Sequence, residues 1–232
     1  VLVFVRNQPE EYGLQPDGDV TSLNPDPVPT TGSSVDENWS LPEARLTPMF
    51  WVLGFGLGSI AMLATGLFFH MISIFSDSGF DSTTAAWVYV PIALTTALVN
   101  LGSGILVDRI AVRTLLATAL FMQVAALILA QFLITPWLAF GYGIVLGTTL
   151  GLMGTINGVA WAKYFGRQHL GSISGVGSTI LIVGAALGPM PFGIARDWLG
   201  SYSLVLAAAA LIPFGLAISC FFIGQPRKKP LI

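Results

Sequence analysis

The stretch TLLATALFMQVAALILAQFLITPWLAFGYGIVLGTTLGLMGTINGVAWA, residues 114–162, contains no Asp, Glu, Lys or Arg. A helix of about 20 apolar residues crosses the hydrocarbon core of a bilayer, which is about 30 Å thick. The stretch is therefore long enough for two such helices, and Thr135-Pro136 near its middle is typical of a break between them. This segment predicts an all-α fold built from membrane-spanning helices.

Four further uncharged stretches are each long enough for one span, so we expect an all-α integral membrane protein with six transmembrane helices. The expected helices cover residues 48–74, 82–107, 114–134, 136–162, 170–194 and 201–223. The composition agrees, because 54% of the 232 residues are hydrophobic and only 9% are charged, whereas about 25% charged residues is usual in soluble domains.

Charge and cysteine usage exclude several classes of protein. The net charge of −2, with ten dispersed basic residues, offers no cationic stripe for nucleic acid. The single Cys220 permits neither a disulfide within the chain nor a cysteine-based metal site.

Residues 171–175 imitate a serine-nucleophile motif, but Ile173 stands where the serine belongs. We therefore expect no enzyme, no cofactor and no metal.

Domain organisation follows from shifts in composition. Residues 1–5 resemble the end of a truncated preceding span, and residues 6–47 form a linker rich in Pro and acidic residues. Residues 48–224 hold the six spans, and residues 225–232 are a basic tail. Placing the linker inside puts nine of the ten Lys and Arg residues on the cytoplasmic side, as the positive-inside rule requires. We expect a cell-membrane protein whose linker and C-terminus are cytoplasmic.

Glycine content predicts which spans pack against protein. Small residues allow close helix packing in bilayers, and the fourth and fifth spans carry rows of glycine at intervals of four, such as Gly143, Gly147 and Gly151. These two spans are expected in the interior. The third span has no glycine and the sixth has only one within its body, so both are expected to face lipid.

Polar residues form one stripe on each of two spans. The second span carries Tyr89, Thr96, Asn100 and Ser103, and the fourth carries Tyr142, Thr149, Asn157 and Trp161, all at helical spacing. Unpaired polar groups are unfavourable in hydrocarbon, so both stripes should face other helices or a water-filled cavity. Contact with a solute and hydrogen bonding between helices both remain open for each residue.

His70 is the one ionisable side chain, Tyr and Cys apart, within the body of a span. Intramembrane titratable groups are often functional, and the imidazole suits proton exchange near neutral pH. Two roles are open for His70: contact with a proton or solute, or hydrogen-bonded packing.

A short motif repeats at an offset of 89 residues. Gly104-Ile105-x-x-Asp108 follows the second span and Gly193-Ile194-x-x-Asp197 follows the fifth. An offset of three spans inverts the second copy in the membrane, so the chain is expected to be a 3+3 inverted repeat, as in many secondary transporters.

The sequence resembles the C-terminal six-helix half of the major facilitator superfamily, a 12-helix fold. Residues 104–113, GILVDRIAVR, are similar to that family's loop signature Gly-x-Leu-Ala-Asp-Arg-x-Gly-Arg-Arg and keep Gly104, Asp108, Arg109 and Arg113, while Ala111 and Val112 depart from it. Residues 6–14, 69–80 and 165–171 resemble the bacterial monocarboxylate and oxalate/formate branch.

This resemblance implies secondary, gradient-driven transport of a small solute by alternating access between two six-helix halves. It places the site between the first and fourth spans, at His70 and the Tyr142-to-Asn157 stripe, and it implies a gating role for the 104–113 loop, with Asp108 facing a helix of the other half. Proton coupling and an organic acid substrate fit the branch. Since the spans hold no Lys or Arg, the other half would have to supply the positive charge that binds the carboxylate of an organic acid.

Two alternatives to a transporter fragment remain open on the sequence alone. The chain can be a half-transporter that works as a homodimer with a second copy. It can also be a non-transporting membrane protein that binds a partner. The expected partners are a solute, lipid, and either the N-terminal half or a second copy.

Overall fold

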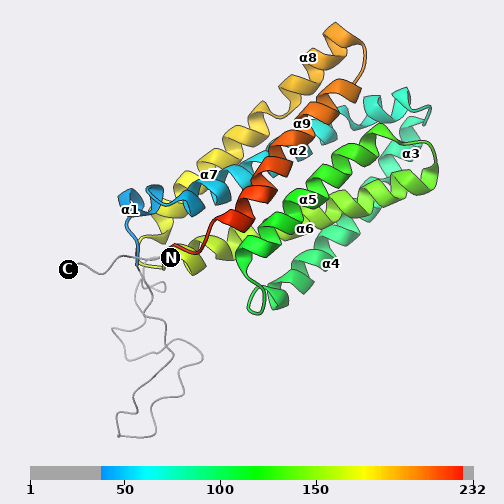
Figure 1. The fold of residues 1–232 in the computed structure, drawn as a ribbon. Helices are drawn as coiled ribbons and strands as arrows, with labels where there is room; N and C mark the ends of the chain where they lie inside the picture. The colour runs from blue at the N-terminus through cyan, green and yellow to red at the C-terminus, as the bar shows by residue number, and fades with distance from the viewer. Residues whose placement is uncertain (1–37, 227–232) are drawn as a thin grey trace, which may run out of the picture. The chain divides into compact units, whose positions relative to one another are not determined.

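A computed structural model describes residues 38–226, and over this range the chain forms nine helices and no strand (Figure 1). The helices are α1 (Leu41–Arg45), α2 (Pro48–Asp77), α3 (Ser82–Trp87), α4 (Tyr89–Leu106), α5 (Val112–Gln131), α6 (Pro136–Phe165), α7 (Leu170–Leu187), α8 (Pro189–Leu199) and α9 (Ser203–Phe222). They make six helical stretches that are long and apolar enough to cross a membrane. The prediction of an all-α chain with six long apolar helical stretches is therefore confirmed over these residues.

Capping residues explain where α2, α3 and α6 begin. Thr47 and Thr135 each precede a proline that opens a 30-residue helix, and each threonine hydroxyl accepts a hydrogen bond from the third residue of its helix at 3.4 Å. Asp81 caps α3, and hydrogen bonds from the Thr84 side chain and N–H lower the pKa of Asp81.

Two predicted helices are each divided in two. The second stretch changes from α3 to α4 at Val88, just before Pro91, and the fifth changes from α7 to α8 at Gly188. Proline has no N–H for the helical ladder, and Pro189 and Pro191 both fall in the first turn of α8. The fifth stretch also runs to Leu199, beyond the predicted end at residue 194.

The last part of the predicted linker, from residue 38, is packed against the helices. Trp39 is buried and its backbone N–H donates to the Phe165 carbonyl at 2.9 Å, while the two rings meet edge to face. Glu43 and Ser40 form a capping box that starts α1. The predicted helix end at 1–5, the linker up to residue 37 and the tail from residue 227 lie outside the described residues.

Three helix pairs make the most extensive contacts: α4 with α6, α2 with α7, and α5 with α9. The first two pairs are close because glycine rows lie between them. A Cβ built on Gly58 of α2 would lie 3.0 Å from the Ile180 side chain, and one on Gly184 of α7 would collide with the Gly58 carbonyl oxygen. The α5–α9 pair packs through larger side chains, such as Phe121 on Phe214.

Burial only partly follows the prediction from glycine content. The first stretch is the most buried, and the fifth is the least, with Ile182, Leu187 and Trp198 exposed, so its assignment to the interior is wrong within residues 38–226. The third stretch, expected to face lipid, is half buried, and the sixth is mostly exposed, as expected. Glycine content therefore indicates where two helices touch, and it does not indicate how much of each helix is covered.

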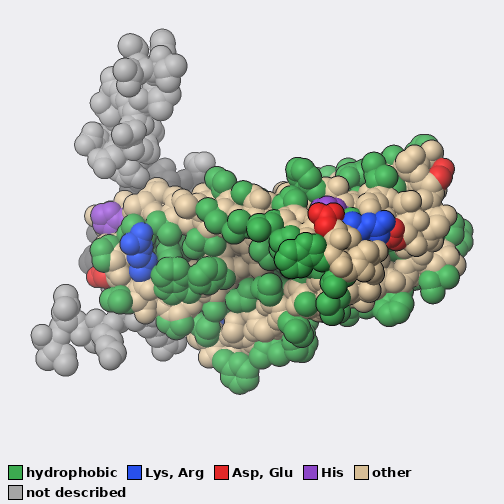
Figure 2. Space-filling view, turned by 90° about the horizontal axis from the view of Figure 1, so that it is seen from above, with side chains coloured by type: hydrophobic (Ala, Val, Ile, Leu, Met, Phe, Trp, Pro, Cys, Tyr) green, Lys and Arg blue, Asp and Glu red, His purple; other side chains and the backbone are tan. Residues whose placement is uncertain are grey.

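Charged side chains gather at the two ends of the helices, and apolar side chains cover much of the visible surface between (Figure 2). We call one end the basic end; of the described cations it holds Arg45, Arg109, Arg113, Lys163 and Arg167. The opposite end holds Asp77, Asp81, Arg196 and Asp197.

Candidate functional site

The polar stripe of the second span lies along α6, and we call this contact surface, formed by Pro91–Ser103 and residues 143–155, the α4–α6 seam. Its glycines bring the two backbones together: a Cβ on Gly147 would lie 2.6 Å from the Ile92 carbonyl oxygen. A Cβ on Gly151 would lie 2.8 Å from the Thr96 carbonyl oxygen. The seam therefore requires glycine on the α6 side.

Hydrogen bonds cross the seam at each turn. The Thr96 hydroxyl donates to the Gly147 carbonyl at 3.2 Å, and the Asn100 amide donates to the Gly151 carbonyl at 3.4 Å. The Ser103 and Thr155 hydroxyls, both buried, lie 2.6 Å apart. The stripe thus makes the interhelical hydrogen bonds that the sequence left as one alternative.

Two amides of the seam region remain accessible. Asn100 is exposed although its Nδ2 is bonded, and Asn157, six residues beyond Gly151 on α6, is half-buried. Asn157 accepts a hydrogen bond from the Trp161 indole at 3.3 Å. Each amide keeps donor or acceptor positions beyond its one bond, so these two residues are the best placed of the predicted set to contact a solute.

The other predicted residues of α6 are buried. Tyr142 packs edge to face on Phe75 of α2, Trp161 packs on Phe50, and Thr149 bonds back to the Val145 carbonyl at 3.2 Å. The helices α2 and α6 therefore contact each other through aromatic pairs. On the second span, the remaining predicted residue Tyr89 is exposed and stacks on Phe68.

His70 is not brought to the α6 stripe. Its Nδ1 lies 3.0 Å from the Tyr202 hydroxyl and its Nε2 lies 3.2 Å from the Pro189 carbonyl oxygen. Because a carbonyl only accepts, Nε2 carries the proton toward Pro189 and a neutral ring accepts from Tyr202 at Nδ1. Both ring nitrogens are therefore occupied, as the packing alternative requires.

The predicted gating loop lies at the basic end. Asp108, Arg109 and Arg113 are exposed, and Gly104 has open space where a Cβ would be. Within residues 38–226 none of these three charged groups forms an ion pair. The loop is anchored instead by Lys163, whose Nζ donates to the Val107 carbonyl at 2.7 Å and so caps the C-terminus of α4.

Sequence reasoning missed Gln123 on α5. Its side chain is fully buried in the stripe that includes Leu116, Leu120 and Leu127. A Cβ built on Gly56 of α2 would lie 3.1 Å from Leu116 of that stripe. Neither the Oε1 nor the Nε2 atom of Gln123 has a hydrogen-bond partner in the described part of the chain. The signal was present in the sequence, since Gln123 is a polar residue near the middle of the expected third span.

Replacing Gln123 with methionine is expected to stabilise the protein. A buried polar group without a partner costs about 1 to 3 kcal/mol, and methionine has nearly the same shape. Thermal unfolding in detergent micelles should therefore shift upward in Gln123→Met. The half-buried Gln131, at the end of the same helix, gives a matched control, because Gln131→Met should leave the transition unchanged. A lower transition temperature in Gln123→Met would contradict this explanation.

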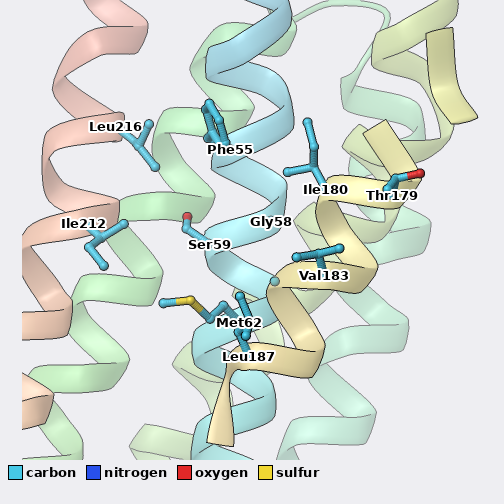
Figure 3. A pocket seen from close by; sticks show the side chains of 11 residues that line it. Phe55, Gly58, Ser59, Met62, Thr179, Ile180, Val183, Leu187, Ile212 and Leu216 are labelled. Atoms are coloured by element: carbon cyan, nitrogen blue, oxygen red, sulfur yellow. The ribbon is translucent and has the colours of Figure 1, made fainter. Parts of the chain in front are cut away.

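An apolar groove of about 590 Å³ lies between α2, α7 and α9 (Figure 3). Phe55 and Met62 of α2 and Ile180 and Leu187 of α7 line it, with Ile212 of α9 at one side. None of the predicted site residues lines this groove. Its polar side chains, Ser59 and Thr179, both donate to carbonyls of their own helices.

No protein-family model and no curated protein matches the chain. Among residues 38–226, no three His, Cys, Asp or Glu side chains are grouped as metal ligands.

Proposed function

We propose that the chain is a six-helix half of a secondary transporter of the major facilitator type. The six helical stretches span a membrane, and with a second half they enclose a route for a small solute. Transport is driven by a gradient and proceeds by alternating access, in which the two halves rock about a central site.

Reciprocal packing between the first and last three stretches is the observation that carries this proposal. The first three stretches form one triplet and the last three form the other. The helix α2, which begins the first triplet, packs on α7 in the second stretch of the other triplet, and α6, which begins the second triplet, packs on α4 in the same way. Both α2 and α6 are 30 residues long. The third helices, α5 and α9, are 20 residues each and pack on one another. Such an exchange is expected for inverted repeats related by a pseudo-two-fold axis, an arrangement common in secondary transporters.

The distribution of charge supports a cytoplasmic basic end. Five of the six Lys and Arg residues within 38–226 lie there, and cytoplasmic loops are enriched in these residues. In this orientation the 104–113 loop is cytoplasmic, and the exposed Asp108 is available to a helix N-terminus of the second half, where a carboxylate is favourable.

We place solute contact at the accessible amides of the α4–α6 seam, Asn100 and Asn157. Amides can donate to and accept from hydroxyl and carboxyl groups, which fits a small organic acid if the second half supplies a cation. The least buried stretches, the second and the fifth, provide apolar surface for contact with the second half.

Uptake into proteoliposomes tests this function. The protein is reconstituted with a complementary six-helix half, and radiolabelled lactate and oxalate are offered with and without a pH gradient. Asn100→Ala and Asn157→Ala are each expected to reduce uptake by about fivefold, the effect of removing a hydrogen bond worth about 1 kcal/mol. Thr118→Val, an exposed position on α5 that bonds its own helix, is the matched control and should not change uptake.

The other outcomes separate the alternatives. Uptake by the chain alone would favour a homodimer. Binding of a partner without flux from any assembled form would favour a non-transporting protein and refute the proposal. If uptake by the His70→Ala variant depends on the pH gradient as uptake by the parent protein does, His70 has no role in proton coupling.

A further inference from the structure

The helix α8 contacts α2 at two points, and the sequence separation between the partners is the same at both. His70 and Pro189 form the first contact, and Asp77 and Arg196 form an ion pair at the second. The partners are 119 residues apart in both cases. Seven residues separate the two contacts on each helix, which corresponds to about two helical turns, so α2 and α8 run side by side between them.

Tyr202, at the start of α9, connects the two contacts. Its hydroxyl lies 3.0 Å from His70 Nδ1, and the Arg196 guanidinium lies over its ring, 5.5 Å from the ring centroid. The Tyr202 side chain is buried. Arg196 also donates to the Gly200 carbonyl at 3.1 Å, at the C-terminus of its own helix. We call the set His70, Asp77, Arg196 and Tyr202 the clasp.

The junction before α8 has few backbone hydrogen bonds. Pro189 and Pro191 have no N–H, so two helical bonds that would join α7 to α8 cannot form within three residues. An apolar groove of about 500 Å³ lies between α8 and α9, and Trp198 of α8 is exposed. A segment with a weakened junction and an exposed side depends on its remaining contacts for its position.

The clasp lies at the end of the helices opposite the basic end, beside a small pocket. Asp77 and Tyr202 line this pocket of about 160 Å³ together with Ser78, Gln131, Ser201 and Ser203. The Asp77 and Arg196 side chains are 35% and 38% exposed, so their ion pair is partly screened. The ion pair of the clasp is therefore weak enough to break without unfolding the helices.

We propose that α8 is a hinged segment that the clasp holds against α2 and α9, and that release of the clasp lets α8 swing outward about Gly188-Pro189. The structure holds the clasped state. This inference concerns movement within the six helices and does not require that the protein transport a solute.

Distances between two spin labels test the hinge. In the full chain carrying Cys220→Ser, one label is placed at Leu101 on α4 and the other at Trp198 on α8, both highly exposed. A second pair joins Leu101 to Ile182, which is exposed on α7 before the hinge. Pulsed electron resonance then gives the population of each distance for both pairs.

The clasp variants are Asp77→Asn, which removes the ion pair, Tyr202→Leu, which removes the ring beneath Arg196, and their combination, and all should move only the α8 label. Removal of either interaction is expected to raise the population of a second Leu101-to-Trp198 distance by about twofold to fivefold, and the combination by about tenfold. The Leu101-to-Ile182 distance should stay constant. Asp81→Asn, an acidic residue at the same end outside the clasp, is the matched control and should behave as the parent protein.

Two results would overturn the inference. An unchanged α8 distance in the double variant would show that packing alone holds α8. A simultaneous shift of the Ile182 label would show that the helices separate as a whole, with no hinge at residue 188. Either result is independent of the uptake measurement, so failure of the hinge and failure of the transporter assignment are distinguishable.

Discussion

Leucine at position 151 is expected to separate α4 from α6, whereas leucine at position 158 of the same helix should be tolerated. A Cβ on Gly151 would lie 2.8 Å from both the Thr96 carbonyl oxygen and the Val99 Cβ, so backbone atoms would have to move. A Cβ on Gly158 meets no atom within 4 Å. Overpacking of this kind costs about 1 to 3 kcal/mol or more, and it also displaces the hydrogen bond from Asn100 to the Gly151 carbonyl.

Thermal unfolding in detergent measures the difference between these two variants. Gly151→Leu should lower the transition temperature by roughly 5 to 10 °C, given about 2 to 4 °C per kcal/mol for a chain of this size. Gly158→Leu should remain close to the parent protein. Equal decreases in both variants would mean that α6 disfavours leucine generally, and the close approach at the seam would not be the cause.

The helices were predictable because their signal is long and repeated. Uncharged stretches long enough for a span indicate all six, and Thr135-Pro136 marks the break between the third and the fourth. The divisions at Val88 and Gly188 were not predicted, although Pro91 and Pro189 lie beside them. A proline within a span can also be accommodated by a kink, so sequence alone does not decide whether it ends a helix.

Glycine spacing predicted close packing but not its extent. The rows in the fourth and fifth stretches do contact neighbours, at the α4–α6 seam and along α2. A row of glycines, however, describes only one side of a helix. Other sides of α7 and α8 are exposed, and nothing in the spacing of glycines carries information about them.

The candidate site was predictable as a set of residues and not as an arrangement. The stripe of Thr96 and Asn100 faces a neighbouring helix, as its spacing indicates. The family resemblance groups His70 with the α6 stripe, whereas the structure places it beside Tyr202 and Pro189. These partners are 132 and 119 residues away in sequence, and no local pattern encodes such a contact.

Compartment-specific labelling of single cysteines tests whether six helices cross a membrane with the basic end in the cytoplasm. We expect an all-or-none result. Cys220 is buried and is replaced by serine, so that each introduced thiol reports alone. Gln168→Cys lies in the exposed turn between α6 and α7, at the basic end. Ser82→Cys lies at the start of α3, at the opposite end, and is also exposed.

A membrane-impermeant maleimide is applied to intact cells and to inside-out vesicles that contain each variant. A charged reagent crosses a bilayer core only at a high cost in free energy, so it reaches thiols on one side alone. Asp81→Cys and Arg109→Cys extend the test to a second exposed position at each end. The six-span topology predicts labelling of positions 82 and 81 only in intact cells, and of positions 168 and 109 only in inside-out vesicles. Labelling of positions 82 and 168 from the same side would contradict it.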